Sequence, residues 1–543
     1  MRWLFIDEIE AVGAETTGDL EETVRFHIHS KNPWKYDPKS GQPRVFGGVN
    51  TVFLGDFWQL RPTGQIALMS SPFAQKAMEN AKAQQIMSMF WDSGISFSLQ
   101  QWPNKQRMLH LDVNERSGQD TWFSDILDRC RAGALTEDDY NFLHGYPTRK
   151  PVEFWYHQRA VNKGQHTLPL CTYEPYCIHQ HWQEYPGMFE CRDCWQERKR
   201  RSRVLDCDAR AAQSIERLTH PQFSEAVLIT QYNVAVFQFG HQRALNFARN
   251  QNSQAFWIQA TDSPPNWYAN GYRHEELLEQ KKKWLGYNAR KTQGILSALL
   301  ACFDMPYRVT SSHGKDFKKY GIYNGAKCRL KAWHLSDKDN QALQNNTDAR
   351  IILKELPKTL FVEMQAEMKE QYPGLPKNWF PMSPTTTYWC LDSDENIDIC
   401  RKGFPLVPNF SMTVDSATGQ TLPAAIPDLG DEFQNPSQHT AMRGYIALSR
   451  VTSADSLLIA QPFNPQLFQM GPQSFPSLLC DVLQGKVPYE TLKDKCEEAT
   501  RESKETKHLK DQRWRCWTCP EPNAWKSWKA FFTGGANGEK DPK

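Results

Sequence analysis

Two short apolar runs, each ending at acidic residues, constrain the fold of this chain more than any other feature. The first run, WLFI at residues 3–6, precedes Asp7 and Glu8; the second, VNTVFL at residues 49–54, precedes a glycine and Asp56. Continuous apolar runs are typical of parallel strands buried on both faces, whose carboxyl ends open onto a shared ligand crevice. The pattern therefore predicts a doubly wound α/β sheet with these acids at one edge.

Carboxylates at such an edge suit phosphoryl transfer. Asp7 would hold Mg²⁺, Glu8 would orient and deprotonate an attacking water, and Gln59 would reach the γ-phosphate or that water. The alternative is that the strands simply stop at solvated acids. The segment GDLEETVRFHIHS, residues 18–30, is predicted to form the crossover helix between the two strands.

The composition is compatible with both a phosphoryl-transfer site and strands that end at solvated acids. The chain has 543 residues, 40% of them hydrophobic and 12% aromatic, which is enough for roughly two to four domains. The formal net charge of +2, from 64 Lys plus Arg against 62 Asp plus Glu, neither demands a nucleic-acid partner nor excludes a local basic groove. The N-terminal sequence reaches acids too early for a signal peptide, and no run of about 18 apolar residues occurs, so we expect an intracellular protein without a membrane span.

Several segments together resemble the Pif-type (petite integration frequency) DNA helicases, the superfamily 1B group that includes RecD-like enzymes. IDEIEAVGAE and FGGVNTVFLGDFWQLRP are similar to motifs II and III, and residues 109–139 resemble the motif IV region, with Arg116 at its arginine position. MTVDSATGQTL (412–422) and GYIALSRVTSADSLLIA (444–460) are similar to motifs V and VI. The resemblance follows the family order over about residues 1–465.

The resemblance implies an α/β fold of two RecA-like domains, the first incomplete, with a small β-barrel-like insertion and a Cys/His-rich insertion. The expected segments are 1–110 for the partial first domain, 111–150 for the motif IV region, 151–215 for the Cys/His-rich insertion, 216–300 and 400–475 for the second domain, 301–399 for the β-rich insertion, and 476–543 for a charged, Trp-rich tail.

The resemblance also implies an ATP- and Mg²⁺-dependent helicase that moves 5′ to 3′ on single-stranded DNA and acts at duplex junctions. Its roles would be repair, recombination and telomere maintenance, in the nucleus or the mitochondrion; no protein partner is implied. Arg116 and Arg450 become arginine fingers that neutralise the transferring phosphate, with Glu8 and Gln59 beside the nucleotide. YIALSR is interpreted as a buried strand ending at Arg450, and a structural ion pair is the alternative for each arginine.

Motif V departs from the family pattern, because Asp415 and Thr418 stand where most relatives have His and Gln. An acid at position 415 would repel a DNA phosphate. The other motif V positions expected to contact the DNA strand are Thr413, Ser416, Gly419 and Thr421. In motif III, Trp58 either stacks on a base or packs between domains.

A group of cysteines and histidines outside the helicase motifs indicates a metal site. Residues 171–194 contain Cys171, Cys177, His179, His181, Cys191 and Cys194. Four of these six would close a tetrahedral Zn²⁺ site, with Cys191 and Cys194 as its C-x-x-C pair; an insertion loop with free thiols is the alternative. The basic run RKRRSR (198–203) either lies along DNA or forms a solvated face, and the pair Cys516 and Cys519 has no assignment.

The phosphate loop of this enzyme class, G-x-x-x-x-G-K-[ST], does not occur in the sequence, since GKDF (314–317) and GKVP (485–488) lack the hydroxyl and the upstream glycine. Two hypotheses follow. The chain belongs to an active helicase whose phosphate loop lies upstream, or it is a nucleotide-dead, transposon-derived remnant that at most binds nucleic acid. In both cases we expect uncovered apolar sheet surface in the first domain and weak Mg-ATP binding.

Overall fold

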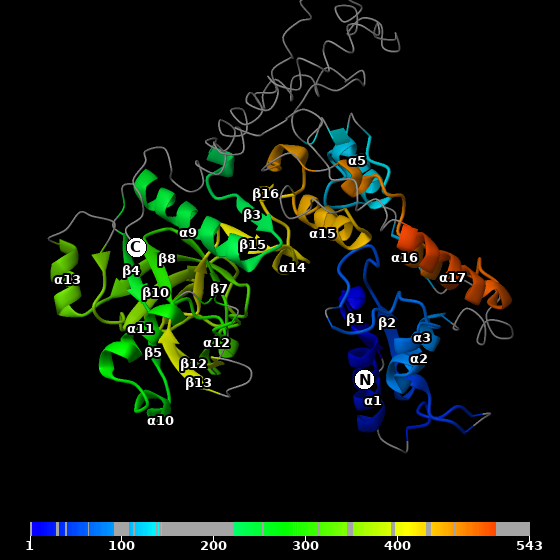
Figure 1. Ribbon diagram of the computed structural model, residues 1–543, viewed down its shortest axis with the longest axis horizontal. Helices are drawn as coiled ribbons and strands as arrows, with labels where there is room; N and C mark the ends of the chain where they lie inside the picture. The colour runs from blue at the N-terminus through cyan, green and yellow to red at the C-terminus, as the bar shows by residue number, and fades with distance from the viewer. Residues whose placement is uncertain are drawn as a thin grey trace, which may run out of the picture. The chain divides into compact units, whose positions relative to one another are not determined.

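The computed structural model describes residues 3–143 and 221–505 apart from short stretches within each range, the longest of them 92–107. Contacts divide the chain into two units (Figure 1). Unit 1 contains the described parts of 1–204, 418–421 and 429–520, and unit 2 those of 205–417 and 422–428. The predicted zinc ligands Cys171, Cys177, His179, His181, Cys191 and Cys194, the basic run 198–203, Cys516 and Cys519 lie outside the described residues.

The two apolar runs of the sequence form the parallel sheet of unit 1. Strand β1 (Trp3–Ile6) pairs in parallel with β2 (Asn50–Phe53), with Trp3 opposite Asn50 and Ile6 opposite Phe53. The prediction of both strands is confirmed. The helix expected at 18–30 is present as α1 (Ala14–His27), which packs against α3 (Ala81–Trp91) and follows β1 in the chain.

The two faces of this small sheet differ. Ile6 and Phe53 pack against the core that includes Phe90 and Trp91 of α3. Trp3 and Phe5 point to the other face and remain 57% and 65% exposed, with their rings stacked 6.4 Å apart. The expectation of a strand buried on both faces is therefore wrong, and the expectation of uncovered apolar sheet surface is confirmed.

The remaining helices of unit 1 come mainly from the second half of the chain. They are α2 (Gln75–Met78), α5 (Thr121–Arg131), α15 (Gln438–Leu448), α16 (Ser474–Leu483) and α17 (Tyr489–Glu505). Helix α15 contains the YIAL of motif VI, so the interpretation of that segment as a strand is wrong. The helix begins at a capping box in which Ser437 Oγ accepts the Thr440 N–H at 3.1 Å, a start signal that an apolar run alone does not show.

Unit 2 contains a parallel sheet in the order β15-β3-β16. Strand β3 (Val227–Thr230) is completely buried between β15 (Ser411–Thr413) and β16 (Ala425–Pro427), as expected for a central parallel strand. Helix α9 (Asn233–Asn250) follows β3 and packs on β15, and the short α14 (Val414–Ala417) follows β15.

A larger antiparallel sheet in unit 2 has the order β11-β10-β8-β7-β14. Its strands are β7 (Pro306–Val309), β8 (Lys327–His334), β10 (Thr359–Met364), β11 (Trp379–Met382) and β14 (Leu406–Pro408). The sheet has open edges within the part of the chain described here, so the barrel-like insertion expected at 301–399 is an open sheet and not a closed barrel.

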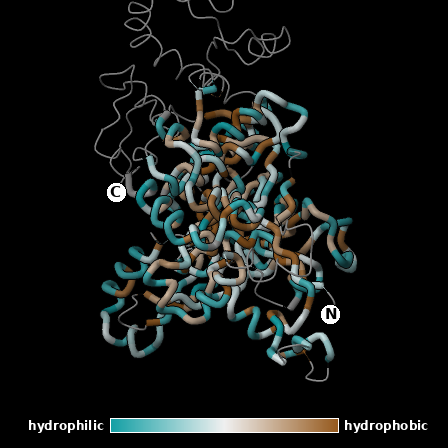
Figure 2. Tube along the Cα trace, turned by 90° about the vertical axis from the view of Figure 1, so that its right-hand side faces the viewer, coloured by the Kyte–Doolittle hydropathy of each residue, from teal (hydrophilic) through white to brown (hydrophobic). Residues whose placement is uncertain are grey.

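Two smaller sheets and several helices complete unit 2. The strands are β4 (Ala255–Gln259), β5 (Thr261–Ser263), β6 (Ala298–Cys302), β9 (Ile351–Ile352), β12 (Thr385–Cys390) and β13 (Asp398–Gly403), and the helices are α10 (Asn266–Ala269), α11 (His274–Trp284), α12 (Lys315–Lys319) and α13 (Asp337–Gln344). Figure 2 shows that apolar and hydrophilic stretches alternate along the chain trace. No helix in the described ranges is long and apolar enough to cross a membrane.

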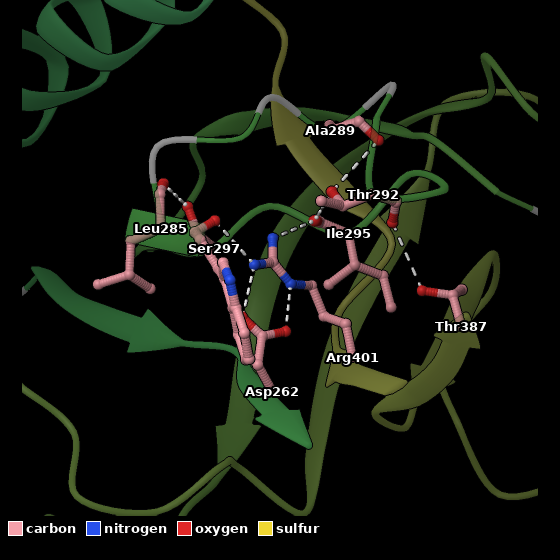
Figure 3. Close-up of polar contacts among 9 residues, drawn as sticks. Asp262, Leu285, Ala289, Thr292, Ile295, Ser297, Thr387 and Arg401 are labelled. Atoms are coloured by element: carbon pink, nitrogen blue, oxygen red, sulfur yellow. Dashed lines mark hydrogen bonds and ion pairs between the residues drawn. The ribbon is translucent and has the colours of Figure 1, made fainter. Parts of the chain in front are cut away.

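One polar cluster lies inside unit 2 (Figure 3). Arg401 of β13 is fully buried and donates from Nε and Nη2 to both carboxylate oxygens of Asp262, at 2.7 and 2.6 Å. The same guanidinium donates to the carbonyl of Trp284 at 3.1 Å and lies over the Trp389 ring. The buried Arg401 guanidinium is therefore paired with a carboxylate and hydrogen-bonded to a carbonyl, as a buried charge requires.

Candidate active site

The acids of motif II lie where the sequence predicts, immediately after β1. Asp7 is exposed, and its Oδ1 accepts the backbone N–H of Glu8 at 2.9 Å. Glu8 is partly buried and has φ 53° and ψ 42°, a left-handed conformation that a residue with a side chain adopts only when its surroundings hold it there. The next residue, Ile9, donates its N–H to Leu54 O at 3.1 Å and thereby ties the end of β1 to the end of β2.

Glu10 forms a second link between the two strand ends, and sequence reasoning did not single it out. Its side chain is 1% exposed, and its Oε2 accepts the N–H of Asp56 at 3.1 Å. Gly55 permits this approach, because a Cβ at that position would lie 2.1 Å from the same oxygen. Burial, together with the neighbouring Glu8 carboxyl, raises the pKa of Glu10 to about 9. Glu10 is therefore a protonated acid at neutral pH, and its carboxyl neighbours that of Glu8.

Asp56 is the centre of the motif III contacts. Its Oδ1 accepts the Trp58 N–H at 3.1 Å and an Arg131 Nη2–H at 2.8 Å, and its Oδ2 accepts the Gln59 Nε2–H at 3.3 Å. The Arg131 guanidinium also lies 4.4 Å above the Trp58 ring. One face of Trp58 is thus covered by an arginine. The Gln59 Oε1 is buried without a hydrogen-bond partner in the described structure, so it is available to a water or a ligand.

The two predicted arginine fingers meet at one residue, Ser449. Arg116 Nη1 donates to the Ser449 carbonyl at 2.9 Å, although the two residues are 333 positions apart. Arg450 is 2% exposed, and its Nη2 donates to Ser449 Oγ at 2.7 Å while its Nε donates to Ile446 O at 2.9 Å. Both guanidinium groups are therefore fixed at the carboxyl end of α15, and that of Arg450 lies back along the helix.

The Arg450 guanidinium interacts electrostatically with Arg116 and with the motif II and III acids. Burial first, and then the positive charge of Arg116, lower the pKa of Arg450 to about 10. The Glu8 and Asp56 carboxyls act in the opposite direction, favouring the charged arginine. Unit 1 thus brings Glu8, Asp56, Arg116 and Arg450 into one neighbourhood, from four separate segments of the chain.

The motif V positions divide between the two units. In unit 2, Thr413 ends β15, and its Oγ1 lies 3.0 Å from Ser416 Oγ, so these hydroxyls bond to each other. Gly419 and Thr421 belong to unit 1 and are exposed. Gly419 has φ 72°, and a Cβ built on it would lie 3.6 Å from Glu8 Oε1. Motif V therefore reaches the motif II acid through its glycine.

The acids at the strand ends are suited to the Mg²⁺ ion of a magnesium–nucleotide complex. Mg²⁺ is commonly held by one or two carboxylates together with substrate phosphates and waters, and the exposed Asp7 carboxylate is suited to that role. The described residues contain no group of three or more acids, histidines or cysteines placed to hold a metal by themselves. The sequence also offers no Gly-Lys-Ser or Gly-Lys-Thr to cradle the phosphates. The acids at the strand ends are therefore suited to Mg²⁺ that is bound to a nucleotide. The phosphate-binding loop that would hold the nucleotide does not occur in the sequence.

Comparisons with known proteins identify no matching family model and no matching curated protein. Among solved structures, the Pif1 helicase from Candida albicans matches with a TM-score of 0.42 and 15% identity over 86% of this chain and 73% of that chain. The Bacteroides Pif1 helicase in complex with ADP-AlF3 and ssDNA matches with a TM-score of 0.42 and 13% identity, covering 93% of this chain and 76% of that one.

Proposed function

We propose that unit 1 carries the acid and arginine half of an ATP-hydrolysis site in a 5′ to 3′ DNA helicase, with single-stranded DNA and duplex junctions as its substrates. The supporting observation is the neighbourhood of Glu8, Arg116 and Arg450. An acid that orients water and arginines that neutralise the transferring phosphate are the groups phosphoryl transfer uses. The roles that follow from the motif resemblance are repair, recombination and telomere maintenance in the nucleus.

Each residue has a defined task in this proposal. Asp7 would hold Mg²⁺, and the bound ion would neutralise charge on the nucleotide phosphates. Glu8 orients the attacking water and accepts its proton, while the free Gln59 Oε1 accepts a hydrogen bond from the same water. Arg116 and Arg450 balance charge at the phosphate, for which Arg450 must exchange its Ile446 contact for the nucleotide. Turnover also requires a phosphate loop, and the motif G-x-x-x-x-G-K-[ST] does not occur in this sequence.

Nucleotide binding and hydrolysis test the proposal directly. This chain should bind Mg-ATP weakly in equilibrium measurements, and micromolar affinity would show that the phosphates are held in another way. A chain supplied with a phosphate-loop strand and helix should hydrolyse ATP, and Arg450→Ala should lower its kcat on the order of 10³-fold. Arg129→Ala is the matched control, because Arg129 pairs with Asp139 within unit 1 at 2.7 Å and has no task at the phosphate.

A second candidate is a nucleotide-dead remnant that at most binds nucleic acid. Asp415 favours it, because an exposed acid in motif V would repel a DNA phosphate. If the helicase proposal holds, Asp415→His should raise the stimulation of hydrolysis by single-stranded DNA. A chain with a phosphate loop that shows no hydrolysis, with or without this substitution, supports the remnant.

A further inference from the structure

A pair of unneutralised cations lies on the outer face of the five-stranded sheet in unit 2. Tyr307 and Val309 of β7 and Cys328 of β8 point into the core, each with 1% exposure or less. Side chains alternate along strands, so the residues between them point outward. Arg308 and Lys327 are directly opposite each other in the antiparallel β7–β8 pairing, and both are only partly exposed.

Neither of these two cations has an acidic partner in the described part of the chain. Their neighbours on β8 do: Arg329 Nη2 lies 2.5 Å from Glu225 Oε2, and Lys331 Nζ lies 2.7 Å from Asp304 Oδ1. Arg308 Nη1 is buried and has no hydrogen-bond partner. Among the described residues, acids therefore neutralise Arg329 and Lys331, and the cross-strand pair of Arg308 and Lys327 has no such partner.

Arg308 differs from Arg401, the buried and fully paired arginine of the same unit. Arg401 is buried with a bidentate carboxylate and a carbonyl around it (Figure 3). At Arg308, by contrast, burial lowers the pKa with nothing opposing it, and the pKa of Lys327 is lowered by burial and by the charge of Arg308. Like charges directly opposite on two strands destabilise a sheet, and a buried N–H without an acceptor adds to the cost. An oxyanion between the two groups would remove both penalties.

We propose that Arg308 and Lys327 form a binding site for a phosphate of a single-stranded nucleic-acid backbone. A guanidinium presents a planar pair of donors that matches phosphate oxygens, and an adjacent ammonium adds a second charge-assisted contact. The phosphate chemistry stands on the geometry of the pair alone. The choice of a nucleic-acid backbone over free phosphate rests on the proposed function, which brings single-stranded DNA to the chain.

The test compares the wild-type chain with the double variant Arg308→Gln plus Lys327→Gln. Without ligand the variant should unfold ~1–3 °C higher, since the like-charge repulsion is gone. Wild type should gain thermal stability from inorganic phosphate at constant ionic strength, and the variant should not. In fluorescence anisotropy with an oligo-dT strand, the variant should bind roughly 5- to 10-fold more weakly at low salt, and its log-log salt dependence should be shallower by about 0.7 for each phosphate that it no longer neutralises.

Lys331→Gln is the matched control, because Lys331 lies on the same strand and the same face but is already paired with Asp304 and Glu363. It removes one positive charge as well, yet it should leave the salt dependence unchanged and lower the unfolding temperature. Equal oligonucleotide binding and equal salt dependence in wild type and double variant would overturn the proposal. Loss of the phosphate effect with unchanged oligonucleotide binding would overturn the nucleic-acid source, and a wild type that responds to neither ligand would overturn the site itself. Failure of the helicase proposal would appear differently, as absent ATP hydrolysis by a chain supplied with a phosphate-loop strand and helix, with oligonucleotide binding intact.

Discussion

Replacing the buried acid Glu10 by glutamine should make unit 1 more stable at neutral and alkaline pH. The side chain is 1% exposed, and its pKa is raised from 4.5 to about 9, chiefly by burial. A glutamine keeps the shape and the acceptor for the Asp56 N–H, offers an N–H toward Glu8, and never has to ionise. The substitution therefore removes a cost that grows with pH and leaves the contacts in place.

The sign follows from proton linkage. Because the folded chain holds a proton that the unfolded chain releases above pH 4.5, stability falls as the pH rises from 4.5 toward 9. Each pH unit in that window costs up to about 1.4 kcal/mol, so the full penalty at pH 7 would be roughly 3 kcal/mol. Relaxation and water entry reduce such penalties, and we expect Glu10→Gln to exceed wild type by about 1–3 kcal/mol at pH 7.5 and to equal it at pH 4.5.

The assay is urea unfolding at both pH values, with hydrogen exchange over α1 assigning the transition to unit 1. Glu21→Gln on α1 is the matched control, since Glu21 is equally buried but accepts from Arg25 Nε at 3.1 Å and from the Phe46 N–H at 3.0 Å. Its loss should destabilise the unit at pH 7.5. A Glu10→Gln variant that follows the wild-type pH dependence, or that is less stable than wild type at pH 7.5, refutes the reasoning.

Three further outcomes are expected. Arg401→Met should lower the free energy of unfolding of unit 2 by roughly 3–5 kcal/mol in urea titrations, because it leaves the Asp262 carboxylate buried without its partner; a loss below 1 kcal/mol, on the order of an exposed pair, would contradict this. Arg131→Ala should lower the free energy of unfolding of unit 1 by about 1–2 kcal/mol and change the Trp58 fluorescence, because the substitution removes both the cation over the Trp58 ring and the ion pair with Asp56. Unchanged Trp58 emission would contradict this expectation. Stoichiometric Zn²⁺ should be found in the purified chain and should be lost in the Cys191→Ala plus Cys194→Ala variant, and zinc that survives this change would exclude those ligands.

The sequence predicted the parts of unit 1 that depend on local pattern. Both strands were placed within one residue, because a short apolar run ending at Asp7 or at Gly55 and Asp56 has few other solutions. The same reasoning misread YIAL of motif VI, since four apolar residues suit one turn of a buried helix as well as a strand. The capping box at Ser437 and Thr440, just upstream, is the signal that separates the two.

The contacts that assemble the site were beyond sequence reasoning. Arg131 bonds to Asp56 across 75 positions, and Arg116 bonds to Ser449 across 333, so no local pattern contains either pair. Glu10 was visible as a third acid in IDEIE, but only the close approach of Gly55 shows that it is buried. Likewise, Trp3 and Phe5 belong to an apolar run that is typical of buried strands. Their exposure depends on which strands lie beside β1, which the run itself does not show.

The proposed hydrolysis site is tested by steady-state ATP hydrolysis, with and without single-stranded DNA, by a chain that carries a phosphate-loop strand and helix fused before Trp3. We expect DNA-stimulated hydrolysis that Glu8→Gln abolishes while equilibrium nucleotide binding is retained, because Glu8 orients and deprotonates the water. Glu15→Gln, a substitution of the α1 acid whose Oε2 accepts the Ile66 N–H at 3.1 Å, should leave hydrolysis nearly unchanged. Normal turnover in Glu8→Gln would contradict the assignment of the chemistry to this strand end, and an inactive fusion would favour the nucleotide-dead remnant.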